Sequence, residues 1–381
     1  MMKLKILNYI LILSLLLSTT VSAEPKFRYS FEEALEMALE NSLEYESKAN
    51  TIKKAYDAFD AAQSSAPKEV KFTGSMKKFI SSQVDPAIKV EETYNNYQQA
   101  LLDRNNTKVT IALNLRSAVI AVENAEMDLE EANLNKKIWE EELKQLELKF
   151  DKNLITKPEY ENKKTDLENK LKDLDKYQDN LDEAYYKLNA LLGRQNQKDI
   201  AITLDDTVVP LEKLDLDQIK KDMINRDLSI AQKKNERFVK KYYFDLIDLR
   251  YSKYTQDSLT DSMLDDIWEM YEEAKKDFET ADMNYEKALE NFDKEFDDML
   301  EDIKDTMEQI NEIKQDISEE ERNAEISKLK YEARMITRSQ YNSSLNRITL
   351  LKNDLRAAEL QLNLKYAKLL AYSDLSKVVK E

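Results

Sequence analysis

Hydrophobic residues recur at alternating spacings of three and four over long parts of the chain. One row has nine positions, eight of them apolar: Val122, Ala125, Leu129, Ala132, Lys136, Trp139, Leu143, Leu146 and Phe150. A second row has ten positions, eight of them apolar: Tyr160, Lys164, Leu167, Leu171, Leu174, Gln178, Leu181, Tyr185, Leu188 and Leu192. This heptad spacing is typical of coiled coils. The two rows predict an antiparallel helical hairpin with one continuous return helix, whose arms of roughly 35 residues reach about 50 Å.

A capping pattern marks the turn between the two rows. Thr156 stands three residues ahead of Glu159, a capping-box arrangement that satisfies free amides at the start of a helix. The same arrangement returns at Thr337 and Gln340. We call the sequence separation between Thr156 and Thr337 the duplication offset. The same offset relates each residue from 150 to 185 to its counterpart in the second copy, without a gap. A constant offset across a turn and its return helix indicates an internal duplication.

Both halves also begin alike. Ser30 and Glu33 form a further capping box ahead of an amphipathic helix over residues 31–43, and Asp215 precedes a matching helix. The first return helix can end at Gly193, because glycine readily takes the left-handed conformation of a helix C-cap.

These signals divide the chain into two tandem repeats. The first helical-hairpin repeat covers residues 24–193, and the second covers residues 215–381. Residues 194–214 form a linker, in which Ile200, Ile202 and Leu204 alternate and predict one short strand.

The N-terminus has the pattern of a secretory signal. Lys3 and Lys5 precede an apolar run over residues 6–17, and small residues at 21–23 suit a cleavage site. Residues 1–23 are therefore predicted to be a signal peptide. The alternative is an N-terminal membrane anchor, although the run is shorter than the ~20 residues that a spanning helix needs. We expect an exported protein of the cell envelope: at the outer membrane or in the periplasm if the organism has an outer membrane, and otherwise extracytoplasmic.

Composition narrows the possible functions. The 381 residues include no Cys, no His, 2 Gly and 5 Pro, and 35% are charged, which favours a predominantly all-α fold and leaves no cysteine nucleophile or imidazole base. A net charge of −17 repels nucleic acid. The acidic clusters at residues 140–142 and 297–298 are interpreted as solvated helix faces. We predict no enzyme activity, no catalytic or metal-binding residues and no cofactor.

The stretch from residue 68 to residue 84 differs from its surroundings and predicts a break between helices. It contains four lysines in an acidic protein: Lys68, Lys71, Lys77 and Lys78. It is either a solvated connector or a contact with an anionic surface.

The sequence resembles the TolC family of outer-membrane efflux and secretion proteins. The resemblance rests on the opening helix at residues 31–43, the end of the return arm at residues 188–194, and the duplicated hairpin. Family members carry a Gly-Leu pair at the hairpin tip, followed by a threonine. Asn153 and Arg334 take the place of that glycine here. Because arginine adopts the left-handed conformation less readily than asparagine, the second tip is expected to have a different shape.

The resemblance implies a homotrimer whose hairpins form a hollow helical duct, working with a periplasmic-type adaptor and an inner-membrane pump. It also implies that the hairpin tips contact the adaptor. The corresponding residues are Asn153, Leu154, Ile155, Thr156, Arg334, Met335, Ile336 and Thr337. Local packing of the apolar tip residues is the alternative, although exposed apolar residues at a turn often mark an interface.

In the family, strands inserted between the helices of each repeat close into an outer-membrane barrel. Here only Val70 and Phe72 alternate between residues 67 and 86, and residues 242–268 have a helical composition. The protein is therefore expected to have little or no β-barrel. Two hypotheses remain: a duct that exports small molecules or polypeptides, and an exported coiled-coil scaffold or adaptor-binding protein without a pore.

Overall fold

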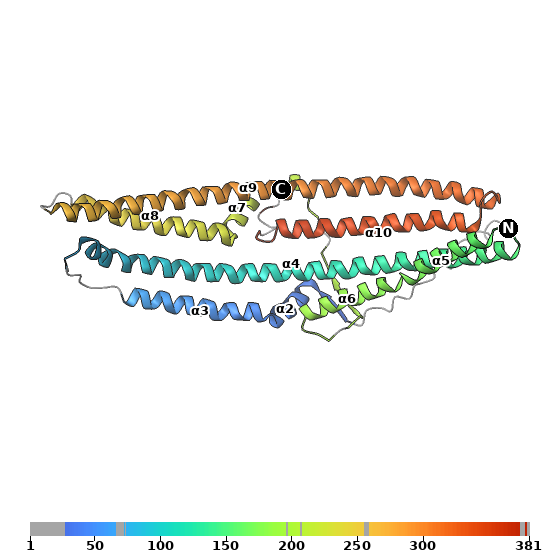
Figure 1. Ribbon diagram of the computed structural model, residues 1–381, viewed down its shortest axis with the longest axis horizontal. Coiled ribbons are helices and arrows are strands. Elements are labelled where there is room, and N and C mark those ends of the chain that lie inside the picture. The colour runs from blue at the N-terminus through green and yellow to red at the C-terminus, as the bar shows by residue number, and fades with distance from the viewer. Residues whose placement is uncertain are drawn as a thin grey trace, which may run out of the picture.

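Two very long helices run along the molecule, and the shorter helices pack against them (Figure 1). They are α4 (Met76–Asp151) and α9 (Asp261–Glu332), with 76 and 72 residues. At 1.5 Å per residue, each exceeds about 100 Å. The computed structural model describes residues 27–65, 72, 74–195, 197–205, 208–254, 259–373 and 378. The predicted signal peptide, Lys68, Val70 and Lys71 lie outside these residues.

Each long helix has a shorter helix against its first half and another helical segment against its second half (Figure 1). The first half of the chain contains β1 (Phe27–Ser30), α2 (Phe31–Asn41), α3 (Leu43–Ser64), α4, α5 (Lys157–Lys172) and α6 (Asp175–Leu191). The second half contains β2 (Ile200–Thr203), η1 (Leu211–Lys213), α7 (Leu216–Arg226), α8 (Leu228–Tyr254), α9 and α10 (Arg338–Leu369). The prediction of a predominantly all-α fold with long antiparallel hairpins is confirmed.

The strands of the described residues form one small sheet. β1 and β2 pair in parallel, with Phe27 opposite Ile200 and Ser30 opposite Thr203. The predicted strand in the linker is thus present, and it ties the linker to the start of the first half. Ser30 then caps α2, and its capping box with Glu33 is complete, as predicted.

The predicted helix break over residues 68–84 is wrong in its second part, because α4 already begins at Met76. The hydroxyl of Ser75 accepts a hydrogen bond from the amide of Lys78 and caps the helix. Met76, Ile80 and Val84 recur every four residues, so they share one face of the helix, and all three are buried against α8 and α9. The lysines between them hid this apolar stripe in the sequence.

The first return arm is also different from the prediction. Instead of one continuous helix, it contains α5 and α6, separated at Asp173 and Leu174. The amide of Leu174 donates to the carbonyl of Leu171, and the amide of Tyr177 donates to that of Leu174, so tight i→i−3 bonds replace the α-helical pattern here. The second return arm, α10, is continuous.

Buried residues extend the duplication well beyond the turn. Several pairs of core residues are separated by the duplication offset: Ala100 and Ala281, Leu115 and Phe296, Val122 and Ile303, Tyr185 and Tyr366, and Leu188 and Leu369. The partners of two of them repeat as well. Tyr185 donates a hydrogen bond to Glu126, and Tyr366 contacts the sulfur of Met307, which occupies the position equivalent to Glu126. α9 is therefore the structural counterpart of α4 over most of its length.

Among the described residues, no helix is both long enough and apolar enough to cross a membrane.

Candidate functional site

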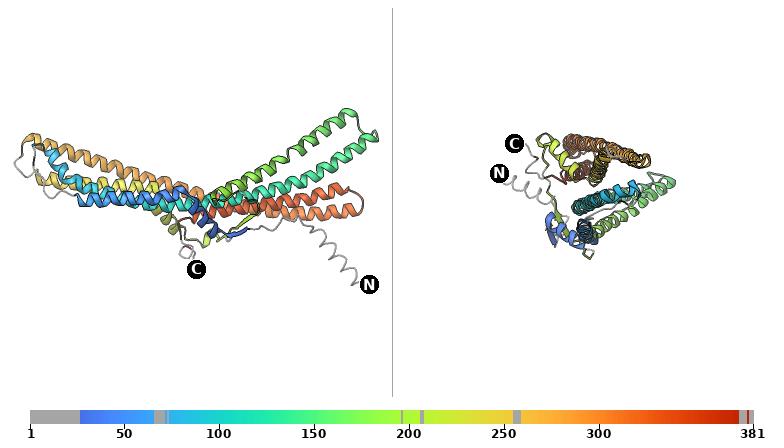
Figure 2. Two further views of the ribbon diagram at one scale, coloured as in Figure 1. Left: turned by 90° about the horizontal axis from the view of Figure 1, so that it is seen from below. Right: turned by 90° about the vertical axis from the view of Figure 1, so that its left-hand side faces the viewer.

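The two hairpin tips project from the same end of the molecule (Figure 1). One tip joins α4 to α5, and the other joins α9 to α10. Seen from below, the first hairpin bends away from the second, so the tips stand apart (Figure 2). The predicted adaptor-contact residues therefore form two separate groups, one at each tip.

Hydrogen bonds close the first tip. Asn153 has φ 53°, in the left-handed region. Its amide donates to the carbonyl of Phe150 at 2.9 Å, and the amide of Leu154 donates to the carbonyl of Lys149 at 2.9 Å. This pair of bonds is the Schellman motif, which satisfies carbonyls at the end of a helix.

The second tip repeats this backbone. Arg334 has φ 59°, and its amide donates to the carbonyl of Tyr331 at 2.9 Å. The amide of Met335 donates to the carbonyl of Lys330 at 2.8 Å. The expectation of a differently shaped second tip is therefore wrong. The reason is that the Schellman bonds determine the turn, and arginine adopts the left-handed conformation at a cost of roughly 1–2 kcal/mol.

The helix caps after the two turns differ. At the second tip the capping box is complete. The side-chain oxygen of Gln340 accepts a hydrogen bond from the backbone amide of Thr337 at 2.9 Å, and the backbone amide of Gln340 donates to the threonine hydroxyl. At the first tip only half of the predicted box forms. Thr156 accepts from the amide of Glu159, but the Glu159 carboxylate pairs with Lys163 at 2.9 Å.

A stacked aromatic pair lies below each turn. The rings of Phe150 and Tyr160 are 4.4 Å apart, and those of Tyr331 and Tyr341 are 5.5 Å apart, with interplanar angles of 12° and 8°. Each pair joins the two arms of its hairpin just before the turn. The turns are thus held by backbone hydrogen bonds and by the stacks.

Apolar side chains at the tips are exposed. Leu154 is 68% exposed and Met335 is 74% exposed, whereas Ile155 and Ile336 are half-buried. The other four predicted contact residues are exposed: Asn153, Thr156, Arg334 and Thr337.

Sequence reasoning missed a second exposed apolar pair near the tips. Leu148 is 56% exposed and Leu329 is 66% exposed. Both lie outside the heptad rows, and the duplication offset relates one to the other. An off-row leucine that recurs at this offset was the signal that could have revealed them.

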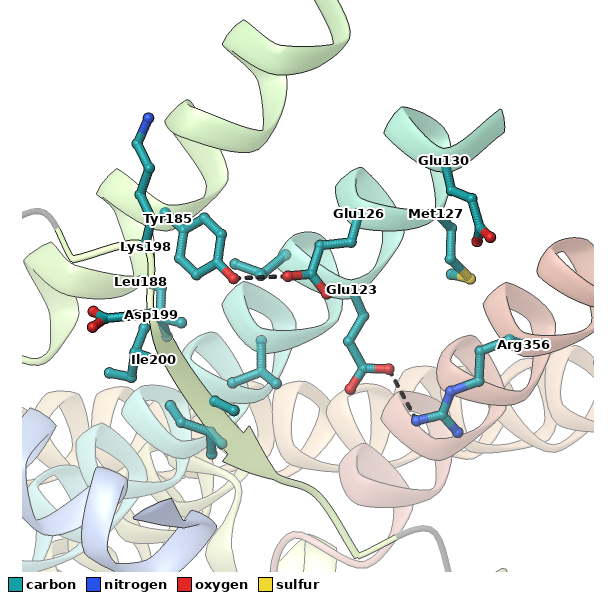
Figure 3. Close-up of a pocket in the computed structure, with 14 residues that line it drawn as sticks. Glu123, Glu126, Met127, Glu130, Tyr185, Leu188, Lys198, Asp199, Ile200 and Arg356 are labelled. Atoms are coloured by element: carbon teal, nitrogen blue, oxygen red, sulfur yellow. Dashed lines mark hydrogen bonds and ion pairs between the residues drawn. The ribbon is translucent and has the colours of Figure 1, made fainter. Parts of the chain in front are cut away.

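A cleft of about 650 Å³ lies at the base of the first hairpin, lined by α4, α6, β2 and one side chain of α10 (Figure 3). Tyr185 donates to Glu126 at 2.7 Å, and Arg356 pairs with Glu123 at 2.9 Å. Burial, together with the bond to Glu126, raises the pKa of the Tyr185 phenol above its ordinary value. Tyr185 therefore stays protonated and acts as a donor.

Several carboxylates lie close together near the cleft. Burial is the main cause that raises the pKa of the Glu131 carboxyl, and the negative charges of Asp354 and Asp128 raise it further. In the described part of the chain, no group of three or more acidic residues is placed to hold a metal ion. The acidic clusters at residues 140–142 and 297–298 are exposed to solvent, as interpreted from the sequence.

Comparison with known proteins finds similarity in structure alone. No family model matches the sequence, and no curated protein matches it. The CmeC outer membrane channel of Campylobacter jejuni superposes with a TM-score of 0.64 at 10% identity, over 90% of this chain and 85% of that one. The outer-membrane channel OprN gives 0.63 at 11% identity, over 93% and 95% of the two chains. VceC of Vibrio cholerae gives 0.55 at 14%, over 88% and 95%.

These similarities agree with the duplicated hairpins and long helices of the present chain. The resemblance that the sequence indicates is therefore confirmed at the level of the fold. The chain has the fold of TolC-like outer-membrane channels.

Proposed function

We propose that the protein is a TolC-like duct component of the cell envelope that exports small molecules or polypeptides. One observation carries this proposal: two hairpins with the same tip backbone stand on the fold of outer-membrane channels. Long helices arranged side by side can enclose a passage when several copies assemble, and the polar faces of this acidic chain suit a water-filled one.

The proposed partners follow from the same arrangement. A homotrimer would complete the duct, and a periplasmic-type adaptor together with an inner-membrane pump would deliver the cargo. The tips are the proposed adaptor contacts, because Leu154 and Met335 are exposed apolar residues at the ends of rigid turns. Leu148 and Leu329 extend that surface along the hairpins.

The proposal includes the limits of the repeats and the location. Residues 1–23 would be removed on export, and residues 24–193 and 215–381 would be the two copies of one duplicated unit joined by residues 194–214. The duplication offset that buried positions share supports this division. The mature protein would reside at the outer membrane or elsewhere in the envelope.

One observation favours the second candidate, an exported scaffold or adaptor-binding protein without a pore. Residues 76–86 belong to α4, and residues 242–254 and 261–268 belong to α8 and α9, so these described positions are helical. The TolC-family resemblance implies strands at both places. A scaffold would need the hairpins and their tips but no passage.

Electron microscopy of the purified mature protein distinguishes the two candidates. A duct predicts ring-shaped end views with a central lumen and side views at least as long as α4. Monomers or solid rods would refute the duct and leave the scaffold.

A further inference from the structure

A groove lined with amide side chains runs between α4 and α8, in the half of the molecule away from the tips (Figure 1). Its volume is about 370 Å³, within the range of roughly 300–1,000 Å³ that is typical of small-molecule sites. Five amides line it: Asn95, Asn96 and Gln99 from α4, and Gln232 and Asn235 from α8. Gln99 and Asn235 also line a continuation of about 310 Å³, which reaches Tyr285 of α9. The groove therefore offers a row of amides together with one aromatic ring.

The five groove amides have no partner within the described protein. No described residue forms a hydrogen bond with any of these side chains, and the buried Nδ2 of Asn95 is left without an acceptor. Other amides of the described chain serve the fold: Asn41 donates to carbonyls at the end of α6, and Asn106 donates to the carbonyl of Arg226. A buried donor without an acceptor costs about 1–3 kcal/mol. A bound ligand that carries acceptors would remove this cost.

The duplication shows that the fold does not require amides at these positions. At the duplication offset, α9 has charged and hydroxyl side chains in place of Asn95, Asn96 and Gln99, namely Lys276, Asp277 and Thr280. α9 is helical throughout this stretch all the same. The amide row of α4 is therefore particular to the first copy, and helix formation does not explain it.

Charges around the groove are balanced. Three charged side chains line it, and each is paired with a neighbour outside the groove: Glu92 with Lys89, Glu236 with Lys233, and Lys240 with Asp277. These ion pairs leave neither sign of charge in excess. Val239 supplies the apolar part of the lining, and the exposed Lys234 adds a hydrogen-bond donor in the continuation. The ligand that fits is therefore neutral and rich in hydrogen-bonding groups.

We propose that the groove between α4 and α8 binds a neutral oligosaccharide. Each amide side chain has an oxygen that accepts and a nitrogen that donates, which matches sugar hydroxyls that do both. The ring of Tyr285 offers a surface for the apolar face of a sugar ring. An extended peptide fits less well, because its side chains need pockets of their own. The inference goes beyond the proposed duct, since a scaffold without a pore would carry the same groove.

Calorimetric titration of the full-length protein with three neutral tetrasaccharides tests the proposal: chitotetraose, cellotetraose and maltotetraose. We expect at least one of them to bind, and we expect the anionic tetragalacturonate not to bind. If none of the three neutral sugars binds, the proposal is refuted. It is also refuted if an octapeptide of alternating glycine and serine binds and the sugars do not, because the groove would then take extended peptides.

Variants of the groove locate the site. Asn95→Ala combined with Gln99→Ala should weaken sugar binding about tenfold, the effect expected for two lost hydrogen bonds. The melting temperature should not fall, because neither side chain is bonded to the described protein. The matched control is Asn114→Ala, an exposed amide about 20 Å away on the same helix, which should bind the sugar like the natural chain.

A second variant guards against a change in folding. Asn95→Lys combined with Gln99→Thr copies the residues that α9 has at the equivalent positions, so it keeps side chains that suit a long helix. This variant should also lose about tenfold in sugar binding. Sugar binding that is unchanged in both double variants would refute the groove as the site, and it would leave the proposed duct untouched.

Discussion

The two hairpins share a backbone but differ in the side chains that support it. Both tips have a left-handed residue, a Schellman turn and an aromatic stack at equivalent positions. The first hairpin, however, has a return arm broken at Asp173 and Leu174 and a phenol bonded to a carboxylate, whereas the second has a continuous α10 and a phenol against a thioether. The backbone geometry of the tips is therefore the same in both hairpins, while the chemistry along the arms differs.

The largest effect should come from charging both tips. Under the proposed function, replacing Leu154→Asp and Met335→Asp together should abolish export, because two carboxylates would be buried in the proposed adaptor contact. The melting temperature should stay within about 2 °C, since both side chains are exposed. Accumulation of a fluorescent efflux substrate in the source cells measures export, and circular dichroism measures melting.

Met283→Asp is the matched control for the tips. Met283 is 64% exposed on α9, far from either turn, so the same apolar-to-acidic change should leave export intact. A large fall in melting temperature in the tip variant would instead mean that Leu154 and Met335 stabilise their hairpins. If Leu154→Asp and Met335→Asp are tested one at a time and only one of them abolishes export, the two tips are not equivalent.

Next in size is the response of the two cores. Leu188 and Leu369 are equivalent residues, 2% and 0% exposed. Replacing either by alanine should lower the free energy of unfolding by about 2–5 kcal/mol, because each change leaves a cavity. Urea denaturation measures the loss. If the duplication extends to packing, the two losses should agree within about 1 kcal/mol; Leu154→Ala, at an exposed site, should cost less than about 0.5 kcal/mol.

The sequence predicted what depends on local pattern. The heptad rows located the first hairpin, the duplication offset located the second, and Thr156 and Thr337 located both turns. It could not locate the start of α4, because the stripe of Met76, Ile80 and Val84 is buried only once α8 and α9 pack on it. Tertiary packing thus decides a helix whose local sequence favours a connector.

The candidate site was predicted in the same uneven way. The positions of the two turns could be predicted, because a capped turn with apolar neighbours is a local signal. The contact of the eight tip residues with an adaptor is what the family resemblance implies, and it stays a prediction. The left-handed conformation of Arg334 could not be predicted, because the intrinsic preference of arginine opposes it. The hydrogen bonds donated by the backbone amides of Arg334 and Met335 overcome that preference. Leu148 and Leu329 lie off the rows, and their exposure depends on where the partner arm lies.

A smaller effect should distinguish the return arms of the two hairpins: the loss of stability at high pH caused by Tyr185 and by Tyr366. Burial is the main cause that raises the pKa of both Tyr185 and Tyr366, with the bond to Glu126 adding to the effect on Tyr185 alone. Both phenols stay protonated in the folded state where the unfolded chain already ionises. Stability should therefore be full below pH 10, the ordinary tyrosine value, and fall above it, by at most about 1.4 kcal/mol per pH unit for each group.

Urea denaturation across pH 8 to 12 measures this decline. Tyr185→Phe and Tyr366→Phe should each make it shallower. Because its carboxylate partner opposes ionisation further, Tyr185→Phe should have the larger effect. If Glu126→Met, which copies the second hairpin, leaves the profile unchanged, the carboxylate plays no part in the difference between the hairpins.

The smallest effect distinguishes the two tips themselves. Arg334→Gly should raise the free energy of unfolding by about 1 kcal/mol, because glycine adopts the left-handed conformation without the clash that an ordinary side chain has. Asn153→Gly should change it by less than about 0.5 kcal/mol, because asparagine already tolerates this conformation. Chemical denaturation of the two single variants measures both changes. Equal gains at both positions would mean that the turn tolerates arginine as well as asparagine, and the shared tip backbone would then reflect the Schellman hydrogen bonds alone.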